Sequence, residues 1–115
     1  MAHTHIISSD RVTGTNIYNT AGEKLGHVEK VMLDKNTGKV AYALGSFGGF
    51  LGIGAKYHPL PWSSLKFDTA KDGYVINFDK RTLEGAPIVD TFEGTYWGDD
   101  VWNRKVHDYY KAPYV

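Results

Sequence analysis

The sequence contains no cysteine among its 115 residues. Without a thiol, disulfide bridges, thiolate catalysis, iron–sulfur ligation and cysteine-based zinc sites are all excluded. A chain of this length buries roughly two thirds of the surface that its unfolded form exposes, so it can build a hydrophobic core without such cross-links. The sequence therefore predicts one compact domain that is held together by packing.

The sequence also lacks net charge and long apolar runs. Its 13 basic and 13 acidic residues balance to a formal net charge of zero at pH 7, so the basic surface that binds a phosphate backbone is missing and we expect no nucleic-acid partner. No apolar run approaches the roughly 18 residues of a transmembrane helix, and residues 1–7 do not read as a signal peptide. We expect a cytoplasmic protein without a transmembrane segment, whose association with any membrane complex is peripheral.

Short β-rich runs fill the first two thirds of the chain and are separated by clusters of Gly, Asn and Asp. This spacing is typical of an all-β barrel or sandwich. The apolar positions change parity inside the second run, so we expect a β-bulge near Glu29-Lys30. Pro59 and Pro61 place the fourth run at an edge or seam of the sheet. The predicted strands are residues 15–18, 24–33, 40–46, 56–62, 65–67 and 74–78.

The last part of the chain differs in kind. Residues 79–85 predict a short helical turn, and apolar pairs at i, i+4 and i+8 predict an amphipathic helix over 101–110 with Asp99 as its N-cap. Two placements of this helix are open: it folds back over the mouth of its own barrel, or it crosses to a second copy and makes a homodimer. The predicted interaction residues of the tail are aromatic: Phe92, Tyr96, Trp97, Trp102, Tyr109 and Tyr110.

Four segments carry a family resemblance by their motifs and their order: GEKLG at 22–26, DKNTGKV at 34–40, SFGGFLGIG at 46–54 and LPWSSL at 60–65. Through them the chain resembles the PRC-barrel domain, which occurs in the H subunit of photosynthetic reaction centres and in a ribosome-maturation factor. The resemblance implies an all-β fold, a small closed barrel of five to six antiparallel strands. Around this barrel at 9–88 we expect a flexible N-terminus at 1–8 and an aromatic, partly helical C-terminal tail at 89–115.

The glycine-rich loop at 47–55 is a second candidate contact surface, through Phe50, Leu51 and Ile53. A phosphate-binding loop is excluded because Ala55-Lys56 stands where Lys-Ser or Lys-Thr is required. Leaving these three side chains in water costs roughly 1.5–3 kcal/mol each. They therefore either cap the core of their own chain or contact a partner.

The histidines and acids do not form a recognisable catalytic set. His3 and His5 offer too few ligands for a closed metal site. His27, His58 and His107 fall on three separate predicted elements, which is typical of half-exposed surface histidines. We therefore expect no enzyme, no metal and no cofactor.

Two functions remain open. The preferred one is a non-enzymatic protein-interaction or assembly module that forms a homodimer, as the resemblance also implies. The alternative is a binder of a flat apolar molecule, such as a quinone or pigment linked to photosynthetic electron transfer, in a barrel mouth lined by Tyr42, Trp62 and tail aromatics. Against this, Trp62 lies beside Leu60 and Leu65, which favours a place in the core.

Overall fold

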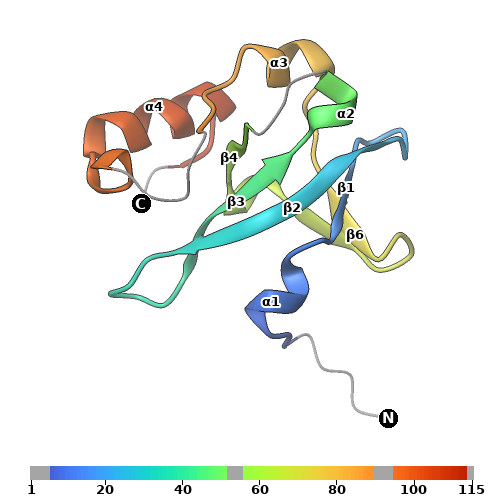
Figure 1. Ribbon diagram of the computed structural model, residues 1–115, viewed down its shortest axis with the longest axis horizontal. Helices are drawn as coiled ribbons and strands as arrows, with labels where there is room; N and C mark the ends of the chain where they lie inside the picture. The colour runs from blue at the N-terminus through green and yellow to red at the C-terminus, as the bar shows by residue number, and fades with distance from the viewer. Residues whose placement is uncertain (1–5, 52–55, 90–94, 114–115) are drawn as a thin grey trace.

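The computed structural model describes residues 6–51, 56–89 and 95–113 (Figure 1). The strands are β1 (Asn16–Tyr18), β2 (Lys24–Leu33), β3 (Val40–Ser46), β4 (His58–Pro61), β5 (Lys66–Asp68) and β6 (Gly73–Val75). The α-helices are α1 (Ser9–Val12), α2 (Gly48–Leu51), α3 (Lys80–Glu84) and α4 (Asp100–Tyr110). Two 3₁₀ turns, η1 (Trp62–Ser64) and η2 (Thr95–Gly98), complete the described elements.

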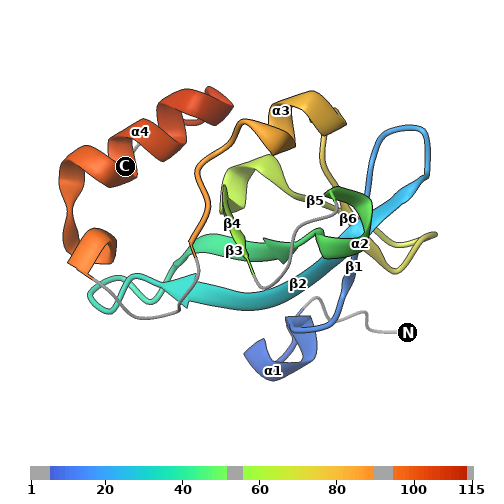
Figure 2. The ribbon, with the colours of Figure 1, turned by 45° about the horizontal axis from the view of Figure 1, so that its top comes forward.

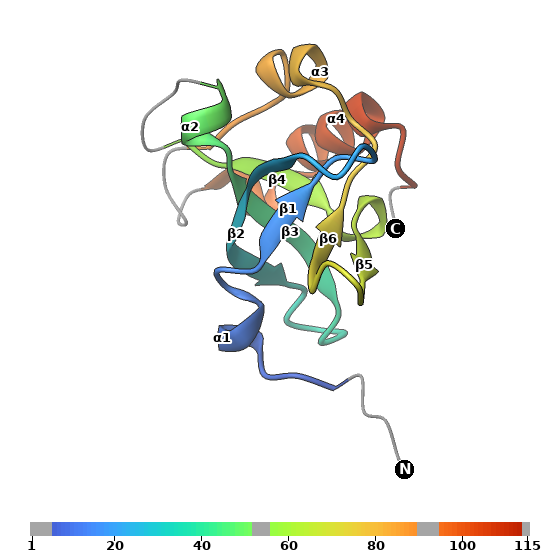
Figure 3. The same cartoon turned by 90° about the vertical axis from the view of Figure 1, so that its right-hand side faces the viewer.

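The strands form one sheet in the order β4-β3-β2-β1-β6-β5. Figure 3 shows that this sheet is strongly curled. The expected antiparallel pattern is wrong at one place, because β1 and β6 pair in parallel. The hydrogen-bonded order ends at β4 and β5, and no pairing between these two is seen in the described residues, so the barrel is not closed by strand pairing there. With its helices, the fold is a mixed sheet with helical additions and not a purely β structure.

The pairing of β1 with β6 was not expected. The two strands can lie side by side because Gly73 in β6 has no side chain. A Cβ atom on Gly73 would lie 2.8 Å from the Asn16 carbonyl oxygen and 2.7 Å from the Tyr18 ring. The backbone of β6 can approach β1 only with glycine at this position. Sequence periodicity does not report such a contact between distant segments.

Several local predictions are confirmed. The pairing of β2 with β3 shifts register between Val28 and Lys30, which is the predicted bulge. Pro59 and Pro61 lie in β4 at the end of the sheet, where their missing N–H groups cost least.

The core is mainly aliphatic and lies between the curled sheet and the helices. Figure 2 shows α3 and α4 on one side of β2 and β3, and α1 on the other. Side chains of this core with no exposed surface come from the sheet, from the residues that flank its strands and from both helices: Ile17, Val28, Phe47, Leu60, Ile76, Leu83 and Val106. Both faces of β3 contribute, since four consecutive residues from Tyr42 to Gly45 are buried.

None of the described helices has the length and apolar character needed to cross a membrane.

Candidate functional site: an aromatic cleft

A cleft of about 880 Å³ opens between the tip of the β2–β3 hairpin, η1, η2 and α4. Three of its lining residues are aromatic: Tyr42 from β3, Trp62 from η1 and Trp97 from η2. Polar residues from the hairpin tip, including Lys35 and Asn36, lie at the same cleft. The cleft thus combines aromatic surface with polar groups at its border.

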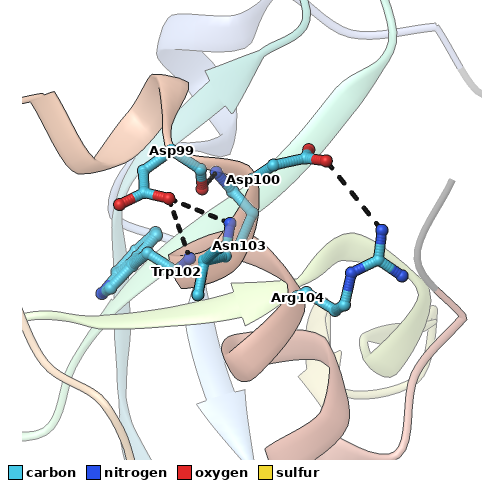
Figure 4. Close-up of polar contacts among 6 residues, drawn as sticks. Asp99, Asp100, Trp102, Asn103 and Arg104 are labelled. Atoms are coloured by element: carbon cyan, nitrogen blue, oxygen red, sulfur yellow. Dashed lines mark hydrogen bonds and ion pairs between the residues drawn. The ribbon is translucent and has the colours of Figure 1, made fainter.

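Both ends of α4, the helix at this cleft, are capped. The Asp99 side chain accepts hydrogen bonds from the backbone N–H groups of Val101 at 2.9 Å and Trp102 at 3.3 Å (Figure 4). This is the predicted N-cap, and it satisfies two of the N–H groups that a helix start leaves unpaired. At the other end, Lys111 adopts a left-handed conformation with φ of 55° and ends the helix.

Asn103 connects α4 to the floor of the cleft. Its side-chain N–H groups donate to the backbone carbonyls of Trp97 at 3.2 Å and Asp99 at 2.8 Å. The amide oxygen therefore points the other way, where it accepts from the Tyr42 hydroxyl at 2.5 Å. Because Asn103 is 8% exposed and Tyr42 3% exposed, this network orients the Tyr42 ring in a largely water-free setting.

Tyr42 is also the centre of a group of rings that we call the aromatic cluster: Tyr42, Trp97, Trp102 and His107. The Tyr42 centroid lies 5.8 Å from that of Trp97, 6.4 Å from that of Trp102 and 5.4 Å from that of His107. Trp97 and Trp102 meet edge to face at 5.3 Å. Such tilted contacts each add about 0.5–1.5 kcal/mol beyond the burial of area. The tail is thereby attached to the sheet by oriented rings.

Trp62 is not simply a core residue. It is half-buried, packs against the core, and meets the Tyr74 ring at 5.4 Å, as its apolar neighbours in the sequence predict. It also lines the cleft, which the alternative function had predicted. One side chain therefore serves both packing and the cleft surface.

The predicted tail residues have different environments. Trp97 and Trp102 pack against the core, and Tyr110 is 6% exposed. Burial raises the pKa of Tyr110 well above its ordinary value of 10. Tyr109 is 39% exposed and its hydroxyl donates to the Thr82 carbonyl at 2.7 Å, which joins α4 to α3. Within one chain, α4 thus folds back over its own sheet.

Two of the predicted tail residues are not described in this way. Phe92 lies outside the described residues, and the side chain of Tyr96 is not among those described.

Of the predicted loop residues, Leu51 is the one with a described side chain. It is half-buried in α2 and packs against the core. This agrees with the alternative in which the loop residues cap the core of their own chain. Phe50 also belongs to α2, but its side chain is not among those described, and Ile53 lies outside the described residues. The role of this loop as a contact surface stays a prediction.

The expectation that His27, His58 and His107 are half-exposed surface residues is wrong for His58 and His107. His58 is 1% exposed, because all four residues of β4 are covered on both faces. Its Nε2 donates to the Leu83 carbonyl at 2.8 Å, while desolvation lowers its pKa below the ordinary value of 6.5. His107 is 9% exposed and belongs to the aromatic cluster. His27 stays at the surface, where its Nε2 lies 3.0 Å from a Glu29 carboxylate oxygen.

Within the described residues, no three histidine or acidic side chains converge in a way that could hold a metal ion. His3 and His5 lie outside that part of the chain.

Sequence reasoning missed Asn103 and the hairpin tip. The signal for Asn103 was available, because this amide lies on the apolar stripe of the helix, one turn before Val106 and two before Tyr110. A polar side chain on a buried face needs a partner. The contribution of the hairpin tip depends on how far the β2–β3 hairpin reaches past the sheet, which no local pattern reveals.

Comparison with known proteins supports the resemblance seen in the motifs. No curated protein matches the chain. The PRC-barrel domain, however, matches residues 5–83, which is well over half of the sequence. The matched range holds all six strands, α3 up to Leu83 and the Tyr42 and Trp62 positions of the cleft, whereas η2 and α4 lie beyond it. The chain therefore belongs to the PRC-barrel domain family.

Proposed function

We propose that this chain is a non-catalytic docking module that binds a protein partner through the aromatic cleft. The observation that carries the proposal is that half-buried Trp62 and Trp97 and the buried Tyr42 gather around one opening of about 880 Å³. Tyr and Trp dominate the energetics of protein interfaces, especially where they are held rigidly and surrounded by polar residues. The Tyr42–Asn103 hydrogen bond supplies that rigidity before any partner arrives.

The described titratable groups support docking and not catalysis. The imidazole of His58 is buried and donates to a backbone carbonyl, and that of His107 donates to the Pro113 carbonyl at 2.9 Å. His27 and Glu29 form a pair on the surface of β2, with side chains that are 42% and 36% exposed. A general base needs a substrate site beside it and an orienting group behind it. His58 has no such site, because it is buried and does not line the cleft.

The test is site-specific photocrosslinking in the native cell. A benzophenone amino acid at Ser63, an exposed residue that lines the cleft, is expected to give an adduct with a protein. The matched control is Ala70, which is also exposed but lies in the loop between β5 and β6, away from the cleft lining. Protein adducts from Ser63 that are absent from Ala70 support the proposal. Equal adducts from both positions, or none from Ser63, contradict it.

A second function is favoured by one observation, the size of the cleft. Ligand pockets commonly enclose about 300–1,000 Å³, and this cleft falls in that range. A flat apolar molecule such as a quinone or pigment would then lie against Tyr42 and Trp62. Native mass spectrometry of the protein purified from its own source tests this: a bound organic molecule that is lost in a Trp62→Ala variant supports the second function, and a ligand-free mass contradicts it.

A further inference from the structure

The C-terminal segment of the chain already lies at one end of the aromatic cleft. After the left-handed Lys111, the backbone N–H of Ala112 returns to the His107 carbonyl at 2.8 Å, so the chain reverses against the last turn of α4. Pro113 then lines the cleft, and its carbonyl lies 2.9 Å from His107 Nδ1. The segment that contains Pro113 is thus held against the aromatic cluster by a hydrogen bond from the His107 ring.

This contact shows which chemistry the cleft accepts. A carbonyl oxygen can only accept, so Nδ1 of His107 carries the hydrogen and donates to Pro113. Further donors are carried by the hairpin tip, where two of the lining residues are Lys35, which has an ammonium group, and Asn36, which has an amide. Asp34 lines the cleft as well, and its Oδ1 accepts from the backbone N–H groups of Asn36 at 2.8 Å and Thr37 at 3.1 Å within the hairpin. The border of the cleft therefore favours a ligand rich in carbonyl acceptors.

An extended peptide that contains proline has these properties. Proline lacks a backbone N–H, so such a segment presents carbonyl acceptors without donors that need a partner. Its restricted backbone also loses little conformational entropy on binding. Proline rings pack on aromatic side chains, and proteins that bind polyproline II segments use grooves lined by Trp and Tyr. Tyr42, Trp62 and Trp97 give this cleft such a lining.

We infer that the partner segment bound by the aromatic cleft is an extended, proline-containing peptide that lies beside Pro113 and reaches toward Lys35 and Asn36. This inference rests on the proposed docking function and names its ligand class. Tyr42 forms the floor, Trp62 and Trp97 contact the proline rings, and donors at the border bind the peptide carbonyls. Pro113 stays in place as one wall of the cleft.

The test uses the full chain and an array of capped nonapeptides that carry two prolines at every relative spacing. Each peptide is paired with a control in which both prolines are replaced by alanine. Binding is followed by amide and indole NMR shifts. We expect at least one proline peptide to bind ten or more times tighter than its alanine control, with shifts at Tyr42, Trp62 and Asn103 and none at Ala70. If no proline peptide binds better than its control, or if the shifts gather outside the cleft, the inference is overturned.

The crosslinking experiment separates this inference from the proposed function. If Ser63 captures a protein and the crosslinked segment contains proline, both stand. If the captured segment contains no proline and the peptide array fails, the ligand class is wrong while the docking function remains. If Ser63 captures no protein, the docking function itself is contradicted.

Discussion

The interior of the curled sheet and the aromatic cluster are built by different means. The interior is filled by fully buried aliphatic side chains such as Ile17, Leu60 and Ile76, which are held by the loss of apolar surface. The cluster under α4 contains rings whose orientation is set by hydrogen bonds, above all that between Tyr42 and Asn103. The interior is sealed, whereas the cluster borders an open cleft. Burial supplies the stability of this molecule, and oriented polar contacts shape the cleft that we propose as the docking surface.

The largest expected effect is the loss of a buried leucine. Leu60 is fully buried, so Leu60→Ala should lower the free energy of unfolding by about 2–5 kcal/mol through lost burial and the cavity left behind. The matched control is Leu33→Ala at the cleft, where the side chain is 54% exposed, and its effect should be much smaller. Urea unfolding measures both. Equal losses would contradict the distinction between a sealed interior and an open cleft.

The next largest effect is expected at the hydrogen-bond network. Asn103→Ala leaves the Tyr42 hydroxyl and the Trp97 and Asp99 carbonyls without their amide partner, which costs about 1–3 kcal/mol. Near-ultraviolet circular dichroism should report the loss of ring order. In a double-mutant cycle with Tyr42→Phe, the two losses should not add, because both variants remove the same hydrogen bond. Full additivity would show that Asn103 does not orient Tyr42.

A smaller loss is expected at the start of α4. Asp99→Ala removes the N-cap and should cost about 1 kcal/mol in urea unfolding. Its neighbour Asp100 is the control, because its exposed carboxylate lies 3.9 Å from the exposed Arg104 guanidinium. Figure 4 shows this ion pair beside the cap. Asp100→Ala should therefore change stability by less than about 0.5 kcal/mol. A reversed order of these two losses would contradict the capping role of Asp99.

The smallest effect at neutral pH concerns His58 and develops only in acid. Its pKa is lowered by burial, and its Nδ1 has no hydrogen-bond partner among the described residues. As the pH falls below the ordinary value of 6.5, the unfolded chain takes up a proton that the folded chain still refuses, so the free energy of unfolding decreases. This decrease continues until the pH reaches the lowered pKa of the folded state.

Urea unfolding between pH 7 and pH 5 checks this point, with His58→Gln as the comparison. Glutamine can still donate to the Leu83 carbonyl but does not titrate, so the variant should lose stability less steeply in acid than the wild type. Equal slopes for the two proteins would mean that His58 is not neutral in the fold.

Much of the fold could be predicted from local patterns. The change of parity in β2 predicts the bulge near Lys30, Asp99 predicts the start of α4, and the prolines of β4 predict an edge strand. Each of these depends on residues that are close in sequence. The parallel pairing of β1 with β6 could not be predicted in this way, because it depends on a contact of Gly73 with the distant Asn16 and Tyr18.

The candidate site could be predicted only in part. The aromatics of the cleft stand out in the sequence, but Trp62 and Trp97 become one surface only when η1 and η2 meet the hairpin tip. His58 illustrates the same limit, because its burial follows from cover on both faces of β4 and not from its own chemistry. The burial of a polar residue depends on tertiary structure. When both faces of a strand are covered, the alternation of apolar and polar residues along that strand does not predict which residues are buried.

The affinity of the partner captured through Ser63 for two matched variants tests the central claim most directly. Trp62 and Phe67 both meet the Tyr74 ring at 5.4 Å, and of the two only Trp62 lines the cleft, although it also packs against the core whereas Phe67 is 51% exposed. If the aromatic cleft is the docking surface, Trp62→Ala should raise the Kd by about tenfold or more, and Phe67→Ala should leave it within about twofold. An unchanged Kd for Trp62→Ala, or an equal rise for Phe67→Ala, would contradict the account.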